Sequence, residues 1–167
     1  GVARGLAASG VPRDDVFITT KVWNDEQGYE ETLAAFERSL DRLRTEYVDL
    51  YLVHWPYPRH MAATWRAMEE IVRSGRARSI GVSNHLEHHL RDLARAASVP
   101  PAVNQFEFHP RLQQPSLVSY CREHGIVVEP WSPIMRGGVL DVPELVEIGE
   151  RHDKTAVQIT LRWILQE

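Results

Sequence analysis

Apolar runs of strand length alternate along the whole chain with stretches in which apolar residues recur every three or four positions. The first pattern predicts strands and the second predicts amphipathic helices. The predicted strands are 16–21, 47–53, 78–82, 102–106 and 126–131. The predicted helices are 29–44, 62–72, 86–96, 115–123, 143–151 and 156–166. Asp141 with Glu144, and Thr155 with Gln158, have the spacing of helix capping boxes.

Each predicted strand ends in a residue suited to chemistry, and a helix follows it. A parallel β/α barrel collects functional groups at the C-terminal ends of several strands. The alternative, an open doubly wound sheet, usually has a glycine-rich phosphate loop after its first strand. No glycine stands in the five residues that follow Lys21, Val22-Trp-Asn-Asp-Glu. We therefore predict an α/β fold, a (β/α)8 TIM barrel. About five consecutive βα units come from this chain, and residues 1–167 form a single domain, an incomplete barrel that lacks the first strands and the last strand.

Composition excludes several classes of partner. The 167 residues are 43% hydrophobic and carry a formal net charge of −4, without a basic stripe. Neither a nucleic acid nor an anionic membrane surface is favoured as a partner. Residues 1–6 lack the features of a signal peptide. The one cysteine, Cys121, is interpreted as a small packing residue, and we expect a cytoplasmic protein.

Two strand ends carry candidate catalytic groups. Lys21 follows the first strand directly, and His54 follows the second on the same face as Leu52. Considered singly, Lys21 is interpreted as a rim residue and His54 as a hydrogen-bonded core residue. Placed together at one rim, the ammonium group would polarise a neighbouring proton donor, and the imidazole would donate a hydrogen bond to a carbonyl oxygen.

The next two strand ends carry amides and a hydroxyl. Ser83 and Asn84 follow the third strand, and Gln105 lies at the end of the fourth. Asn84 with Glu87 is also explained by a helix cap alone. Converging on one rim, these groups would suit the carboxamide of a nicotinamide ring.

The fifth strand ends in Trp131, which is either a core residue or a flat surface on which a ring stacks. Ser132 follows it, and then Arg136, Gly137 and Gly138. Glycines let a backbone approach a phosphate group, and arginine adds positive charge.

A metal site is the competing hypothesis for the histidines. His85, His88 and His89 cluster on one predicted helix. However, no strand carries a His-x-His pair, and carboxylates are scarce at the strand ends. We therefore predict no metal site, and a metal-dependent hydrolase on a β/α barrel stays an alternative.

The strand-end motifs resemble those of the aldo-keto reductases, in the bacterial diketogluconate-reductase-like branch. The matching segments begin at Phe17, Tyr47, Ile80, Asn104 and Trp131 and read FITTKVWN, YVDLYLVHWP, IGVSN, NQFEFHP and WSP. The resemblance implies an eight-stranded barrel that reduces an aldehyde or ketone to an alcohol with NADPH, the small-molecule carbonyl compound being its substrate.

The resemblance also implies a role for each matching residue. Lys21 would tune the catalytic acid and His54 would orient the carbonyl; Ser83, Asn84 and Gln105 would hold the carboxamide; Trp131 would stack on the ring; Ser132, Arg136 and Gly138 would lie along the pyrophosphate; and Trp23 and Trp55 would line the substrate pocket.

The resemblance also implies segments outside residues 1–167. In that family a tyrosine paired with an aspartate donates the proton, and that segment would precede Gly1. The 167 residues alone are therefore expected to be inactive and to self-associate through the open edges of strands 16–21 and 126–131, whereas the intact protein would be a monomer. A non-catalytic barrel that serves as a scaffold or binding protein is a further alternative.

Overall fold

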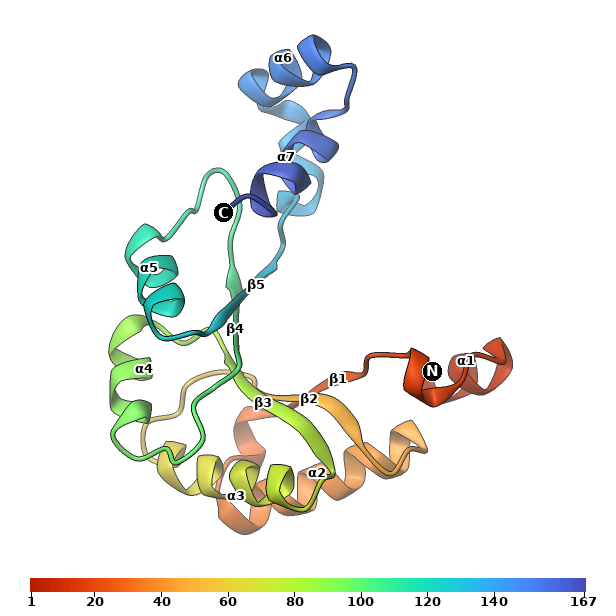
Figure 1. Cartoon of the computed structure of the whole chain (residues 1–167), viewed down its shortest axis with the longest axis vertical. Helices are drawn as coiled ribbons and strands as arrows, with labels where there is room; N and C mark the ends of the chain where they lie inside the picture. The colour runs from red at the N-terminus through yellow and green to blue at the C-terminus, as the bar shows by residue number, and fades with distance from the viewer.

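The computed structural model describes all residues from 1 to 167. Its centre is a sheet of five strands, in which each strand pairs in parallel with the next one along the chain. The strands β1 and β5 are the two edges of this sheet (Figure 1). The strands are β1 (Thr19–Val22), β2 (Val48–Val53), β3 (Ala77–Ser83), β4 (Val103–Glu107) and β5 (Val127–Trp131).

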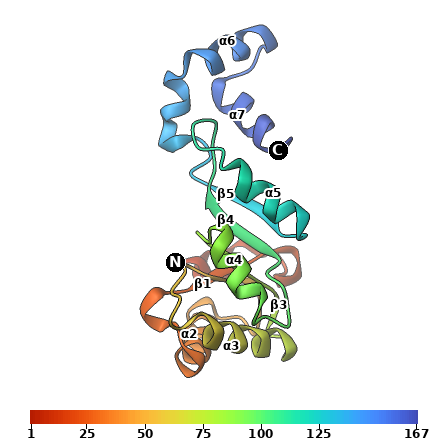
Figure 2. The same ribbon diagram turned by 90° about the vertical axis from the view of Figure 1, so that its left-hand side faces the viewer.

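Four helices, α2 to α5, line the outer side of the curved sheet, and the opposite side is concave (Figure 1). The view in Figure 2, turned by 90°, places α4 and α5 in front of the strands. The helix α1 projects from the N-terminal end, and α6 and α7 extend beyond β5 (Figures 1 and 2). The helices are α1 (Val2–Ser9), α2 (Tyr29–Leu43), α3 (Met61–Arg73), α4 (Glu87–Ala94), α5 (Pro115–Glu123), α6 (Pro143–His152) and α7 (Ala156–Ile164), and short 3₁₀ helices are η1 (Arg13–Asp15), η2 (Asn24–Glu26) and η3 (Met135–Asp141).

The strand order decides between the two predicted architectures. A doubly wound sheet reverses its strand order at a switch point and carries helices on both faces. Here the order is β1-β2-β3-β4-β5 without reversal, and the crossover helices lie on one side (Figure 1). This is the winding of the predicted β/α barrel, and it excludes the doubly wound alternative.

The two faces of the sheet differ in burial. On the outer face of β2, Tyr51 is fully buried, and its ring packs edge-on against Phe36 of α2 at 4.9 Å between centroids. On β4, Asn104 and Phe106 are buried, whereas Gln105 between them is half-buried. The main core therefore lies between the sheet and its helices, and on the concave face Leu50 and Leu52 are buried whereas Gln105 is partly accessible.

An ion-pair network around Asp49 fixes the N-terminal end of the sheet. The candidate site residues lie at the opposite, C-terminal ends of the strands. Asp49 of β2 is 2% exposed, and one carboxylate oxygen accepts hydrogen bonds from the Ile18 N–H at 2.8 Å and from Arg13 at 2.9 Å. The other oxygen accepts from Arg78 at 2.9 Å. Both guanidinium groups also lie over the ring of Tyr47. Three charge-assisted hydrogen bonds make this carboxylate a strong link between β1, β2 and β3.

Most predicted elements are confirmed, with ends shifted by one or a few residues. The helix at 115–123 begins at Pro115 as predicted, because a residue at the first helical position needs no N–H. The Thr155–Gln158 capping box is confirmed. The Asp141–Glu144 box is wrong: Val142 is the N-cap of α6, and no side chain caps it. The helix α1 was not predicted. No helix is both long enough and apolar enough to cross a bilayer.

Candidate functional site

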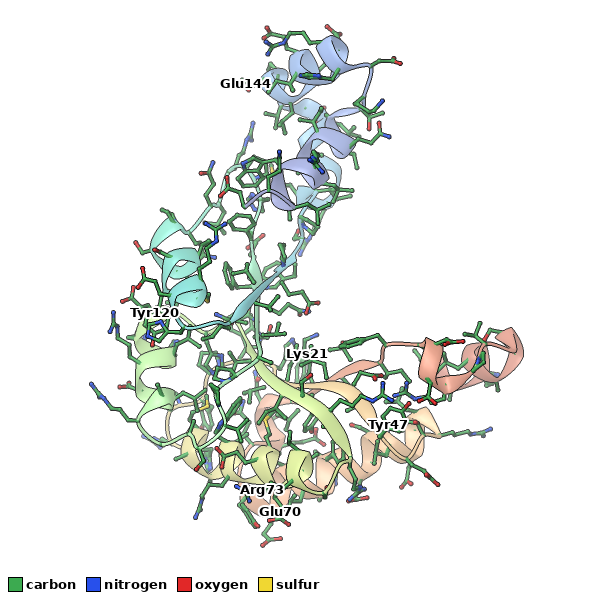
Figure 3. The ribbon with its side chains drawn as sticks, viewed as in Figure 1. Lys21, Tyr47, Glu70, Arg73, Tyr120 and Glu144 are labelled. Carbon is green, nitrogen blue, oxygen red and sulfur yellow. The ribbon has the colours of Figure 1, made fainter.

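The strand register brings the predicted catalytic residues to one face. In parallel strands, residues in register point to the same side of the sheet. Lys21 is in register with Leu52 on β2, and Leu52 with Gly81 on β3. Because His54 follows Leu52 by two residues, it continues along the face that carries Lys21. Figure 3 shows Lys21 beside the strands in the middle of the molecule, on the concave side.

The same rule places the binding candidates on this face. Ser83 is in register with Gln105, and Gln105 with Glu129 of β5. Trp131 follows Glu129 by two residues and therefore shares its side of the sheet. The C-terminal ends of all five strands thus contribute a polar or aromatic group to one concave rim.

His54 lies close to two exposed tryptophans. Its ring centroid is 4.7 Å from that of Trp23 and 6.5 Å from that of Trp55, and these indoles are 53% and 45% exposed. Burial and, second, the ammonium group of Lys21 lower the pKa of His54 below its ordinary value of 6.5. The neutral form of the imidazole therefore predominates at pH 7. Its Nδ1 atom is buried without a hydrogen-bond partner in the protein.

Asn84 joins three strand ends. Its backbone has a positive φ of 60°, and its N–H donates to the Gln105 carbonyl at 2.8 Å. The side-chain Nδ2 donates to the His54 carbonyl at 2.9 Å and to Ser83 Oγ at 3.1 Å. The side-chain oxygen accepts from the indole N–H of Trp131 at 2.7 Å. Asn84 does not cap α4, because Leu86 is the N-cap; its amide instead fixes the position of His54 and Trp131.

Gln105 has one end of its amide bound and one end open. Its Nε2 donates to Glu129 Oε1 at 2.7 Å. Its own side-chain oxygen accepts no hydrogen bond from the protein and is not buried. Sequence reasoning did not single out Glu129. Glu129 could have been predicted from the sequence, because it stands two residues before Trp131 and both therefore lie on one face of β5.

The segment after Trp131 has an unusual backbone. Ser132, Met135 and Arg136 have positive φ angles of 54°, 52° and 54°, and Gly137 has a φ of 96°. A side chain on Gly138 would meet only atoms of Met135 at 3.5 Å. The Arg136 side chain is exposed. The chain therefore turns sharply beside the ring of Trp131, with an open glycine and a free guanidinium group.

The histidines of α4 and the preceding loop do not form a ligand set. His85 is fully buried, and burial lowers its pKa to about 4. Its Nδ1 lies 2.8 Å from the Ser83 carbonyl, so the neutral ring donates there. The rings of His88 and His89 lie 3.8 Å apart. No group of three or more His, Cys, Asp or Glu side chains could hold a metal ion.

Comparison with known proteins gives a consistent result over the whole chain. The model of the aldo/keto reductase family matches residues 2–167. Over 166 residues the chain is 53% identical to the glyoxal reductase of Bacillus subtilis (strain 168), covering 99% of this chain and 60% of that protein. It is 47% identical over 169 residues to a 9,11-endoperoxide prostaglandin H2 reductase of Trypanosoma cruzi (strain CL Brener), again covering 99% of this chain and 60% of that protein.

Solved structures agree in fold. An aldo/keto reductase from Brucella melitensis superposes with a TM-score of 0.95 at 45% identity, covering 99% of this chain and 64% of that one. A Bombyx mori aldo-keto reductase in complex with NADP superposes with a TM-score of 0.90 at 33% identity, covering 99% and 61%. These neighbours are (β/α)8 barrels, which confirms the predicted fold class. The chain spans about 60% of the length of the curated relatives it matches.

Proposed function

Because this chain belongs to the aldo/keto reductase family, we propose that the protein containing it reduces a small aldehyde or ketone to an alcohol with a nicotinamide cofactor, NADPH. When bound, NADPH would supply a hydride to the carbonyl carbon. The carbonyl oxygen takes a proton, so that NADPH and one proton yield NADP⁺ and the alcohol. The relatives' names favour a small dicarbonyl compound such as glyoxal as the first substrate to test.

The observation that carries this proposal is the common face of the five strand ends. Lys21, His54, Gln105 and Trp131 come from four strands, yet the register directs them to one concave rim. Active sites of β/α barrels occupy this rim, and their catalytic residues come from several strands. The register alone would bring these positions together; polar and aromatic side chains occupy them where a purely structural rim would need none, and this indicates a ligand.

The substrate carbonyl would bind beside His54. Burial and the charge of Lys21 lower the pKa of His54, which favours its neutral form. The imidazole therefore donates a hydrogen bond to the carbonyl oxygen without placing a second full charge beside the ammonium of Lys21. The Lys21 charge stabilises negative charge that develops on that oxygen or on the group that protonates it. Trp23 and Trp55 supply apolar surface close to His54.

The nicotinamide ring would bind on the other half of the rim. The side-chain oxygen of Gln105 is accessible and without a partner in the protein, which fits the amide group of a carboxamide. Trp131 presents an aromatic ring that Asn84 holds in place. The open backbone at Ser132–Gly138 and the charge of Arg136 suit a pyrophosphate. The hydrogen bonds of Asn84 leave one lone pair on its side-chain oxygen for the ligand.

Steady-state kinetics test the proposal in the intact protein, meaning this chain with any flanking segments that its gene encodes. NADPH oxidation in the presence of glyoxal is followed for the wild type, Lys21→Met and Lys154→Met. Lys154 is the only other lysine, and it is exposed between α6 and α7. We expect Lys21→Met to lower kcat by at least about 100-fold, as removal of a preorganised electrostatic group does, while Lys154→Met keeps the wild-type rate.

Three other results of these measurements would each lead to a different conclusion. Equal activity of Lys21→Met and the wild type would refute the role of Lys21. Tight NADPH binding without reduction of glyoxal or of other small aldehydes and ketones would support a non-catalytic barrel. A wild-type protein that binds neither NADPH nor NADH would refute the proposed function as a whole.

A further inference from the structure

We propose that Glu129 is a positioning residue that fixes which end of the Gln105 amide faces the cofactor. This inference rests on the proposed function and adds a residue to it. Glu129 lies on β5 directly in register with Gln105 of β4, and its Oε1 is 2.7 Å from Gln105 Nε2. Both side chains are half-buried on the concave face.

The chemistry of the two groups sets the orientation. A side-chain amide has a donor end and an acceptor end of nearly equal size, and in isolation it can rotate to present either one. An ionised carboxylate only accepts hydrogen bonds. The end of Gln105 that faces Glu129 must therefore be the NH₂ group. The opposite orientation would bring two oxygen atoms together, one of them charged, at a hydrogen-bonding distance.

The consequence is a one-sided recognition surface. With its NH₂ group held by Glu129, Gln105 presents its oxygen, and this atom is accessible and without a protein partner. A carboxamide has an NH₂ donor that matches this oxygen, whereas its own carbonyl oxygen does not. Glu129 therefore selects the carboxamide NH₂ as the group that Gln105 binds. Because the acceptor is an ionised carboxylate, this hydrogen bond is charge-assisted, and it holds the Gln105 amide in place before the cofactor arrives.

The backbone supports this preorganisation. Five consecutive residue pairs hold β4 to β5, from Val103↔Val127 to Glu107↔Trp131, and Gln105↔Glu129 is the central one. The Gln105 carbonyl also accepts hydrogen bonds from Ser83 Oγ and from the Asn84 N–H, each at 2.8 Å. The two residues are thus fixed at their backbones, and the hydrogen bond to Glu129 restricts the Gln105 side-chain torsions, the amide rotation among them.

A matched pair of cofactors tests the inference in the intact protein. The 3-acetylpyridine analogue of NADPH carries a methyl group where the carboxamide has NH₂, so it cannot donate to Gln105. Dissociation constants are measured for both cofactors with the wild type and with Glu129→Gln, whose amide lets Gln105 adopt either orientation. Glu144→Gln makes the same chemical change on α6, far from Lys21 (Figure 3), and is the control.

We expect Glu129→Gln to weaken NADPH binding about three- to tenfold, because the Gln105 amide then spends part of its time in the wrong orientation and the neutral partner no longer polarises it. Binding of the acetylpyridine analogue should change less than twofold, and Glu144→Gln should change neither. Glu129→Asp, which keeps the charge but shortens the reach, should resemble Glu129→Gln.

Equal weakening of both cofactors by Glu129→Gln would assign it a general structural role and overturn the inference. Unchanged NADPH binding in an active variant would also overturn it, and would leave the proposed function standing. A wild-type protein that binds neither cofactor would overturn the proposed function and the inference together.

Discussion

A methyl group added at Gly81 should disturb both the sheet and the site. Gly81 lies on the concave side of β3, two residues before Ser83. A Cβ atom there would lie 2.5 Å from the backbone oxygen of Val103 and 2.8 Å from a methyl group of Leu52. The first contact is about 1 Å shorter than an optimal separation, and the atom that it meets belongs to the backbone of β4. The strand itself must therefore move.

The magnitude follows from the position of this contact. Overpacking typically costs about 1–3 kcal/mol, and we expect Gly81→Ala to cost about 2–3 kcal/mol of unfolding free energy, because backbone atoms cannot rotate away. β4 is joined to β3 by only two residue pairs, Val82↔Asn104 and Ser83↔Gln105. A displacement of β4 therefore moves Gln105 relative to Ser83. A shift of about 1 Å in a positioning group can cost about 100-fold in rate. We therefore expect kcat/KM to fall by more than the loss of folded protein would explain.

Urea unfolding and NADPH-dependent reduction of glyoxal measure the two effects. Gly5→Ala is the matched control, because a Cβ atom at Gly5 in α1 meets nothing within 4 Å. Alanine in a helix interior should raise stability slightly at that position. A Gly81→Ala variant with wild-type stability and wild-type kcat/KM would refute the reasoning. A variant that loses stability but keeps its cofactor affinity would show that β4 moves as a unit with the site.

Three further predictions concern buried ionisable groups. Asp49→Ala should lower the unfolding free energy by about 3 kcal/mol, measured by urea unfolding, because it leaves the Ile18 N–H and two guanidinium groups without their carboxylate; a loss below about 1 kcal/mol would contradict this. Tyr51→Phe should raise stability by about 1 kcal/mol in the same assay, because the Tyr51 hydroxyl is buried without a protein partner; a lower midpoint would argue for an unseen partner. His85 has a pKa of about 4 in the folded chain, against an ordinary 6.5. The contribution of neutral His85 to the unfolding free energy is therefore complete above pH 6.5 and is lost as the pH falls toward 4. The stability difference between pH 7.5 and pH 5, taken from urea unfolding at both, should therefore shrink by about 2 kcal/mol in His85→Phe, and an unchanged difference would show that His85 titrates normally.

Much of the fold could be predicted from local sequence patterns. The run Val48–Val53 is almost wholly apolar and forms a strand that is buried throughout. Pro115 starts a helix at the predicted residue. There are two exceptions: α1 lacks buried residues and a side-chain cap, so its sequence carries little signal, and the N-cap of α6 is Val142 rather than Asp141.

The site was predicted only as a set of strand ends. Lys21, His54, Gln105 and Trp131 were found because each follows an apolar run, and the structure places them on one face. The contacts between them were not predicted. Asn84 looked like a helix cap, yet its amide binds the His54 carbonyl and the Trp131 indole.

The sequence alone determined which residues form strands and helices, and in what order, because these choices depend on side chains a few positions apart. Only the tertiary structure decided which of those residues touch. The hydrogen bond between Gln105 and Glu129 spans 24 positions, and the one between Asn84 and Trp131 spans 47. Such contacts depend on the register between strands, and a slip of one residue would turn each side chain to the opposite face. Packing of the whole sheet against its helices fixes that register, and no single segment contains this information.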